Sequence, residues 1–259
     1  MTLNKTLTRA NFWAIAINST VAYLLASIIV FYVNHVMTII GAALFGFDLS
    51  FNYNTIYYHV ESYEWSADSV KLIFSAGPII VLIIGFVSMI FFSKLKEDET
   101  RFKILLLWIG LIAFNHFFGG LVIGNLFKNG VGHVFNWMYL KDTEKMAIAL
   151  FGIFCLVATA LLMARPVAMS TNSYINNLNE DNFPFIITAQ IIVPFLLGTV
   201  LSIAYHFPNV LFQERYSWIS LAAMLVIIVI RINNYNTIYF DEETRKIKLV
   251  WLPVLFTLL

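Results

Sequence analysis

Apolar residues gather in six long runs along this chain, and short polar breaks separate them. The runs cover residues 12–45, 70–93, 102–127, 147–164, 183–205 and 217–232. An α-helix rises about 1.5 Å per residue, so roughly 20 residues cross the ~30 Å hydrocarbon core of a bilayer. The pattern therefore predicts an all-α polytopic membrane protein with about six transmembrane helices.

The first apolar run is longer than a membrane requires. Its 34 residues would form a helix of about 51 Å. Asn34 and His35 interrupt it. We expect this helix either to project well beyond the hydrocarbon or to bend at these two residues.

Two segments between and after the runs favour β-structure. Residues 47–68 alternate polar and aromatic side chains, which predicts an extended strand or a hairpin. After the sixth run, two β-prone stretches flank a charged turn at 241–246, which predicts a second hairpin. The last apolar residues, 252–259, are too few to span and are expected on the membrane surface. The chain thus divides into a helical bundle at 1–232 and a hairpin with a short tail at 233–259.

Composition agrees with a lipid-solvated chain. Of 259 residues, 60% are hydrophobic and 12% are charged, and the mean hydropathy is +0.79. Soluble domains carry about 25% charged residues. The net charge of +1 gives no reason to expect a nucleic-acid partner. The bilayer itself is the first partner that the sequence predicts.

The distribution of basic residues predicts an orientation. With the N-terminus in the cytoplasm and six spans, eleven of the 16 Lys and Arg residues fall on the cytoplasmic side. Cytoplasmic loops of membrane proteins are enriched in Lys and Arg. We therefore expect a multi-pass protein of the bacterial cytoplasmic membrane with both termini inside.

Polar side chains within the apolar runs are the candidate functional residues, because such groups are costly in a membrane. The first run contributes three of them, the third contributes a polar pair and two glycines spaced to admit a close neighbour, and the fifth contributes an amide. These residues are Asn34, His35, Thr38, Asn115, His116, Gly120, Gly124 and Gln190.

Two interpretations of this polar set remain open. Imidazoles bind zinc well, so His35 and His116, with His133 or His59 as a third ligand, are a candidate metal site. The other interpretation is that these groups form hydrogen bonds between helices and fix their packing. No local ligand spacing supports the metal site, so no cofactor is the leading expectation. No carboxylate lies inside an apolar run, so a buried acid–base pair is not visible.

Two segments resemble the site-2-protease-like family of intramembrane metalloproteases. The segment NHVMTIIGAALFGF resembles the helix that carries that family's HExxH zinc motif, and FSAGPIIVLIIGFVSM resembles its second conserved helix. The second segment contains the family's alanine-glycine-proline element as Ala76, Gly77 and Pro78. The resemblance covers residues 33–92, and the strand-like loop between the helices also suits it.

The departures from the family motif imply a non-catalytic member. Asn34 and Thr38 stand at the two histidine positions, and His35 stands at the glutamate. Catalytic zinc needs three protein ligands, and the glutamate activates the bound water. No Asp occurs in the third run to supply the family's third ligand. The family also places this end of the helix toward the cytoplasm, whereas the basic residues place it outside.

The sequence therefore predicts a binding or accessory subunit of a bacterial membrane assembly. Its partner would be another membrane protein, bound by strand addition to the first loop. The first alternative is an active intramembrane metal-dependent hydrolase that uses His35, His116 and His133. The second is a subunit of a small-solute transporter.

Overall fold

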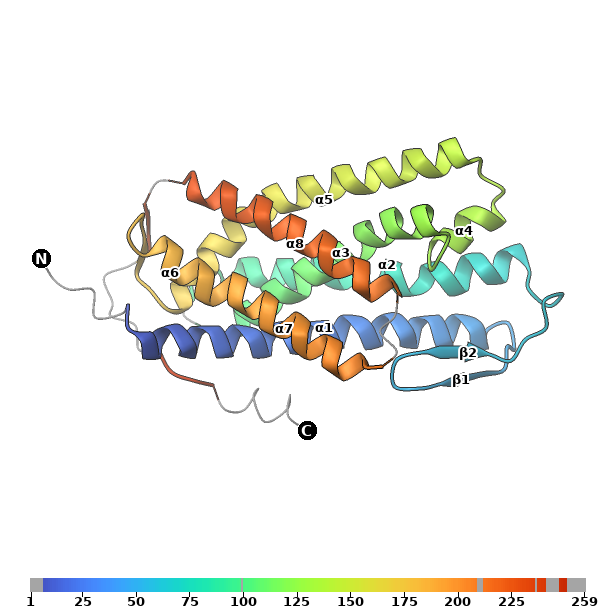
Figure 1. The fold of residues 1–259 in the computed structure, drawn as a ribbon, viewed down its shortest axis with the longest axis horizontal. Coiled ribbons are helices and arrows are strands. Elements are labelled where there is room, and N and C mark those ends of the chain that lie inside the picture. The colour runs from blue at the N-terminus through green and yellow to red at the C-terminus, as the bar shows by residue number, and fades with distance from the viewer. Residues whose placement is uncertain (1–6, 99, 209–211, 236, 241–246, 251–259) are drawn as a thin grey trace, which may run out of the picture.

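The computed structural model describes residues 7–98, 100–208, 212–235, 237–240 and 247–250. Within them, six helical segments are long and apolar enough to cross a membrane, which confirms the predicted all-α polytopic fold. The segments lie lengthwise in one elongated bundle (Figure 1). They are α1 (Arg9–Ala43), α2 (Ala67–Leu95), α3 (Phe102–Phe127), α5 (Asp142–Ser170), the stretch Phe183–His206, and α8 (Phe212–Asn233).

Two of these segments are composite. The helix α5 continues as the short 3₁₀ turn η1 (Thr171–Ser173), and the fifth segment joins α6 (Phe183–Ile187), the π-helical η2 (Thr188–Ile192) and α7 (Val193–His206). Pro194 has no N–H to donate to the carbonyl of Gln190 one turn earlier. The hydroxyl of Ser19 on α1 donates to that carbonyl instead, at 2.5 Å. A neighbouring helix thus satisfies the backbone group that proline leaves without its usual donor.

The helix α1 does not break at Asn34 and His35. It runs for 35 residues, about 52 Å, so it extends beyond a ~30 Å core. Thr38 Oγ1 donates to the Asn34 carbonyl at 2.9 Å, and His35 Nδ1 donates to the Phe31 carbonyl at 2.9 Å. These bonds satisfy the polar groups within their own helix, and the helix is continuous through both residues.

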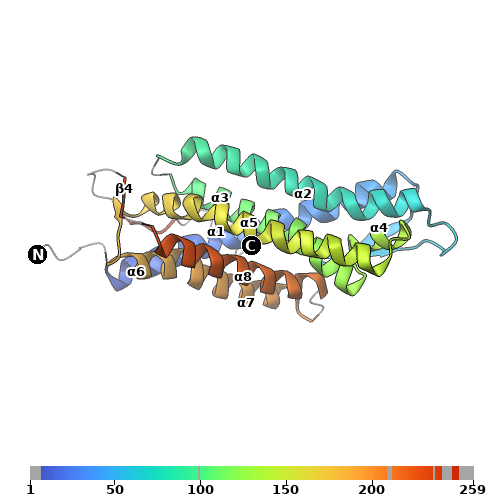
Figure 2. The ribbon, with the colours of Figure 1, turned by 90° about the horizontal axis from the view of Figure 1, so that it is seen from above.

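The bundle is organised around α3. This helix packs against α1, α2, α5 and α8, and it buries Leu107, Trp108 and Leu111 completely. The outer helices turn apolar side chains away from the bundle, with Leu162 of α5 76% exposed and Val200 of α7 63% exposed. Figure 2 shows α2 and α7 on opposite flanks of the bundle. Exposed apolar surface around a buried central helix is the arrangement that lipid, rather than water, can solvate.

Two small antiparallel sheets lie at opposite ends of the bundle. The strands β1 (Leu49–Phe51) and β2 (Ile56–Tyr58) pair as a hairpin, as predicted for residues 47–68. The strand β4 (Ile238–Tyr239) forms where the C-terminal hairpin was expected, but its partner is β3 (Asn177–Leu178) from the loop after α5. The correction concerns the partner: residues 247–250 adopt no strand, and the expected turn at 241–246 and tail at 252–259 lie outside the described residues.

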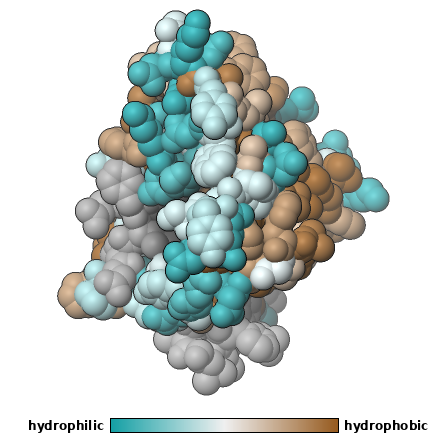
Figure 3. Space-filling model, turned by 90° about the vertical axis from the view of Figure 1, so that its right-hand side faces the viewer, coloured by the Kyte–Doolittle hydropathy of each residue, from teal (hydrophilic) through white to brown (hydrophobic). Residues whose placement is uncertain are grey.

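The described C-terminal residues fold back onto the bundle. The Asn18 side chain on α1 donates to the Lys248 carbonyl at 2.9 Å and accepts from the Val250 N–H at 2.8 Å. This contact lies at the end of the bundle that holds Arg9. The other end, here called the hairpin end, carries β1, β2 and the short helix α4 (Gly132–Trp137). Figure 3 looks onto the hairpin end and shows hydrophilic residues gathered there beside a hydrophobic flank.

Candidate functional site

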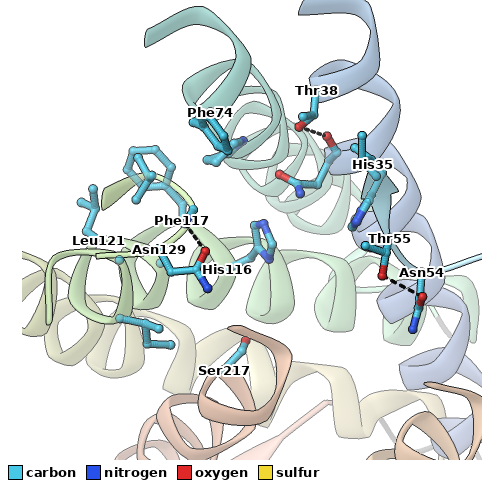
Figure 4. Close-up of a pocket in the computed structure, with 18 of the residues that line it drawn as sticks. His35, Thr38, Asn54, Thr55, Phe74, His116, Phe117, Leu121, Asn129 and Ser217 are labelled. Carbon is cyan, nitrogen blue, oxygen red and sulfur yellow. Dashed lines mark hydrogen bonds between the residues drawn. The ribbon is translucent and has the colours of Figure 1, made fainter. Parts of the chain in front are cut away.

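A cavity of 240 Å³ opens inside the bundle near its hairpin end, and we call it the polar cavity. Figure 4 shows side chains from α1, α2, α3, α8 and the hairpin converging on it. Six of the eight candidate residues predicted from the sequence line it, namely Asn34, His35, Thr38, His116, Gly120 and Gly124. The other lining residues are Asn54, Thr55, Ile56, Tyr58, Phe74, Pro78, Phe117, Leu121, Ile123, Asn129, Gly130, Val131 and Ser217.

The contribution of α1 is an imidazole whose orientation and tautomer are set. A carbonyl only accepts hydrogen bonds, so the bond to Phe31 places the proton of the neutral His35 ring on Nδ1. The ring also packs on Phe31, with centroids 4.1 Å apart. Nε2 of His35 therefore carries a lone pair and is the acceptor that α1 presents to the cavity.

The helix α2 approaches α1 closely at the alanine-glycine-proline element. A Cβ placed on Gly77 would lie 2.6 Å from the carbonyl oxygen of Asn34, and it would also overlap the Asn34 side-chain amide. The Oδ1 atom of Asn34 is buried, and no hydrogen-bond donor for it is found in the described part of the chain. The lack of a side chain at Gly77 thus allows α1 and α2 to pack closely beside the cavity.

The helix α3 supplies adjacent residues with different roles. Asn115 is buried, donates from Nδ2 to both the carbonyl and the hydroxyl of Ser217 at 2.9 Å, and accepts from Ser220 Oγ at 2.8 Å. His116 has no hydrogen-bond partner among the described residues and lines the cavity. Figure 4 shows the His116 and His35 rings on opposite sides of the cavity. The interhelical hydrogen bonds expected of this pair are therefore made by Asn115 and not by His116.

The glycines of α3 also divide their roles. A Cβ on Gly124 would lie 2.8 Å from the Gly132 nitrogen, so the start of α4 makes the close approach expected there. A Cβ on Gly120 would meet nothing within 4 Å, because this residue faces the cavity. The close contact with α8 occurs at Gly119, where a Cβ would lie 2.9 Å from Ser220 Oγ.

A second cavity, of 530 Å³, adjoins the first, and we call it the apolar cavity. Mostly apolar side chains of α1, α3, α7 and α8 line it, and it shares His116 and Ser217 with the polar cavity. Its wall also holds the hydrogen-bonded hydroxyls of Tyr32 and Tyr205, which are 2.6 Å apart. His206, 7% exposed, bonds through Nδ1 to the Ser202 carbonyl and packs on Phe31.

The residues at the zinc-motif positions do not fit a zinc site. The Oδ1 of Asn34 is buried against Gly77, the Thr38 hydroxyl bonds to its own helix, and only His35 presents a nitrogen. In the described part of the chain, no three or more His, Cys, Asp or Glu side chains are grouped so that they could hold a metal ion.

The remaining candidates lie outside the polar cavity. The His133 ring packs on Phe74, 4.9 Å between centroids, and is not among the lining residues; burial lowers the pKa of this imidazole. Gln190 belongs to a separate network with Ser170, away from both cavities. Asn115 lines the apolar cavity.

Sequence reasoning missed the polar residues that loops and α8 bring to the polar cavity. Asn54 and Thr55 come from the hairpin turn, Asn129 from the loop after α3, and Ser217 from the start of the sixth span. Asn54, Thr55 and Asn129 lie outside the apolar runs, and Ser217 is the first residue of the sixth run. Comparison of the chain with family models, with curated proteins and with solved structures found no match.

Proposed function

We propose that this chain is a non-catalytic membrane protein, similar to site-2 proteases, that binds an extended segment of another membrane protein. It would act as an accessory subunit of an assembly in the bacterial cytoplasmic membrane. The observation that carries the proposal is an unpaired strand edge beside the polar cavity. Extended peptides bind such edges through backbone hydrogen bonds, and nearby pockets then select their side chains.

The hydrogen-bond pattern identifies the free edge. The Asn52 N–H donates to the Thr55 carbonyl, and the His59 N–H donates to the Asp48 carbonyl. These bonds make Asn52–Thr55 and Asp48–His59 hydrogen-bonded pairs. Hydrogen-bonded and non-bonded pairs alternate along an antiparallel ladder, so Phe51–Ile56 and Leu49–Tyr58 are non-bonded pairs, and their N–H and C=O groups point away from the partner strand. The N–H and C=O groups of Ile56 and Tyr58 have no backbone partner among the described residues. Both side chains line the polar cavity, so a peptide paired with β2 would lie at its mouth.

The chemistry of the cavity favours binding over hydrolysis. The described residues of its lining include no Asp, Glu, Lys or Arg. General acid–base catalysis needs a titratable group within hydrogen-bond reach of the reacting atoms, and the imidazoles of His35 and His116 have no carboxylate beside them in that lining. The cavity supplies hydrogen-bonding groups and space, which suit recognition of a side chain.

The binding test compares two proline substitutions at opposed positions of the hairpin. Ile56→Pro removes an outward N–H from the β2 edge, and the matched control Phe51→Pro removes one from the β1 edge. A photoreactive amino acid in place of the exposed Tyr57 reports the bound partner by crosslinking in membranes. We expect a crosslinked membrane protein that is lost with Ile56→Pro and kept with Phe51→Pro. Equal crosslinking in both variants, or loss only with Phe51→Pro, contradicts pairing at β2.

The proposal includes an orientation with both termini in the cytoplasm and the hairpin outside. It rests on the excess of basic residues at the end of the bundle that holds Arg9. The only cysteine, Cys155, is replaced by serine, and single cysteines are placed at exposed Ser50 and Glu97. An impermeant maleimide applied to intact cells should label position 50 alone. Labelling of position 97 alone would reverse the orientation and agree with that of the protease family.

One observation favours a second candidate, a metal-dependent hydrolase with a divergent histidine site. The rings of His35 and His116 face one another across the polar cavity, and His116 has no hydrogen-bond partner among the described residues. Metal analysis of the purified protein separates the two functions. Stoichiometric zinc that disappears with His35→Ala would replace the binding proposal with this one.

A further inference from the structure

The apolar cavity has the form of a binding site that is entered from the side. Its volume of 530 Å³ falls in the range of roughly 300–1,000 Å³ that is typical of small-molecule sites. Several of its lining residues also belong to the outer surface of α7, with Val200 63% and Leu201 49% exposed. Because α7 packs on α1 while α8 packs on α3 and α5, the cavity lies between two helices that face lipid. An apolar molecule dissolved in the bilayer can therefore reach it directly.

The inner end of this cavity is polar, because it meets the polar cavity at His116 and Ser217. Beyond that boundary stands His35, whose Nδ1 is already bonded to the Phe31 carbonyl. Its Nε2 accepts hydrogen bonds and has no protein donor among the described residues. The group that best matches this end of the site is thus a hydrogen-bond donor.

The charge of the site restricts the donor further. Among the described residues that line the two cavities there is no Asp, Glu, Lys or Arg. An ammonium or phosphate headgroup would lie there without a counter-charge, and unpaired charges inside a membrane are costly. A neutral hydroxyl avoids this cost and still donates to an imidazole.

We propose that the two cavities together bind a neutral, hydroxyl-bearing lipid. Its hydroxyl would donate to His35 Nε2 beside His116, and its acyl chain would occupy the apolar cavity between α7 and α8. This inference goes beyond the proposed function, because it concerns a ligand inside the bundle and does not depend on a peptide pairing with β2.

The first experiment compares two competitors and needs no variant. The purified protein in phosphatidylcholine nanodiscs is labelled with 1-monoacylglycerol that carries a diazirine in its acyl chain. Unlabelled 1-oleoylglycerol should compete about three- to tenfold better than its diacetate, because a net hydrogen bond contributes about this factor to affinity. The crosslink should map to the helices that line the apolar cavity, namely α1, α3, α7 or α8. Equal competition by the diacetate would overturn the role of the hydroxyl, and crosslinks confined to other helices would overturn the site.

The second experiment tests His35 itself. His35→Phe removes the acceptor and retains an aromatic ring to pack on Phe31, so we expect the apparent affinity for 1-oleoylglycerol to fall about three- to tenfold. His133→Phe is the matched control, because that ring lies outside both cavities. Unchanged affinity in His35→Phe would refute the assignment. The protein crosslink at position 57 and the lipid crosslink inside the bundle are separate readouts, so loss of the crosslinked protein partner and loss of the lipid are distinguishable.

Discussion

Replacing Gly77 with alanine tests how α1 and α2 together form the wall of the polar cavity. The added Cβ would lie 2.6 Å from the carbonyl oxygen of Asn34 and 3.0 Å from its Cγ. The carbonyl belongs to the backbone of α1, so no side-chain rotation removes the overlap. The two helices must therefore move apart.

The size of the effect follows from that displacement. Carbon–oxygen contacts settle at about 3.3–3.6 Å. The helices must separate by roughly 0.5–1 Å, and a gap of this size forfeits about a quarter to a half of each dispersion contact between them. Overpacking of this kind costs about 1–3 kcal/mol, and the higher helix propensity of alanine returns at most about 1 kcal/mol. We expect Gly77→Ala to lower the free energy of unfolding by about 1–2 kcal/mol.

The assay is reversible unfolding of the purified protein in detergent, with Gly120→Ala as the matched control. A Cβ on Gly120 meets nothing within 4 Å, so that variant should be as stable as the parent or slightly more stable. Equal stability of the two alanine variants would refute the close approach. Asn34→Ala should not rescue Gly77→Ala, because the carbonyl remains; a full rescue would place the clash at the side chain.

Three further predictions follow from the described contacts. Asn115→Leu should lower the free energy of unfolding by about 1–3 kcal/mol, because it removes three hydrogen bonds to α8. His116→Leu should change the free energy of unfolding by less than about 0.5 kcal/mol. Equal losses in the two variants would contradict the division of roles. Ser19→Ala should cost about 1–3 kcal/mol, because its hydroxyl accepts from Trp108 Nε1 and donates to a backbone carbonyl; an unchanged midpoint would count against this network. Burial raises the pKa of Tyr58 to about 12, so the neutral phenol stabilises the fold below pH 10, and this contribution is lost as the pH rises toward 12. Ultraviolet titration of the parent protein tests the raised pKa of Tyr58. Unfolding midpoints of Tyr58→Phe should lack the loss of stability at high pH.

The six spans were predictable because their cause is local. Each run had to be apolar over the thickness of a bilayer, and the structure places a helix at every one. The hairpin at 47–68 was also predictable, since alternation is a property of neighbouring residues. The partner of β4 was not, because β3 lies in a distant loop and two-residue strands carry little pairing preference.

The candidate site was predictable in part. Polar residues in apolar runs are conspicuous, and six of the eight chosen ones line one cavity. Gln190 has the same signature but forms a separate network, because its position on η2 faces Ser170. The partners of Asn115, the open space at Gly120 and the loop residues Asn54 and Asn129 depend on how helices pack, and no local pattern encodes that.

By itself, the sequence determined that this chain is a helical membrane protein, where its spans lie and which polar side chains must be accommodated within them. Those conclusions follow from the cost of exposing polar groups to hydrocarbon, which acts on every residue separately. Only the tertiary structure decided that α1, α2 and α3 line a polar cavity, that it shares the wall residue His116 with an apolar one, and that β2 offers its edge there. These features arise from interlocking surfaces such as Gly77 against Asn34, whose fit exists only once the helices are packed.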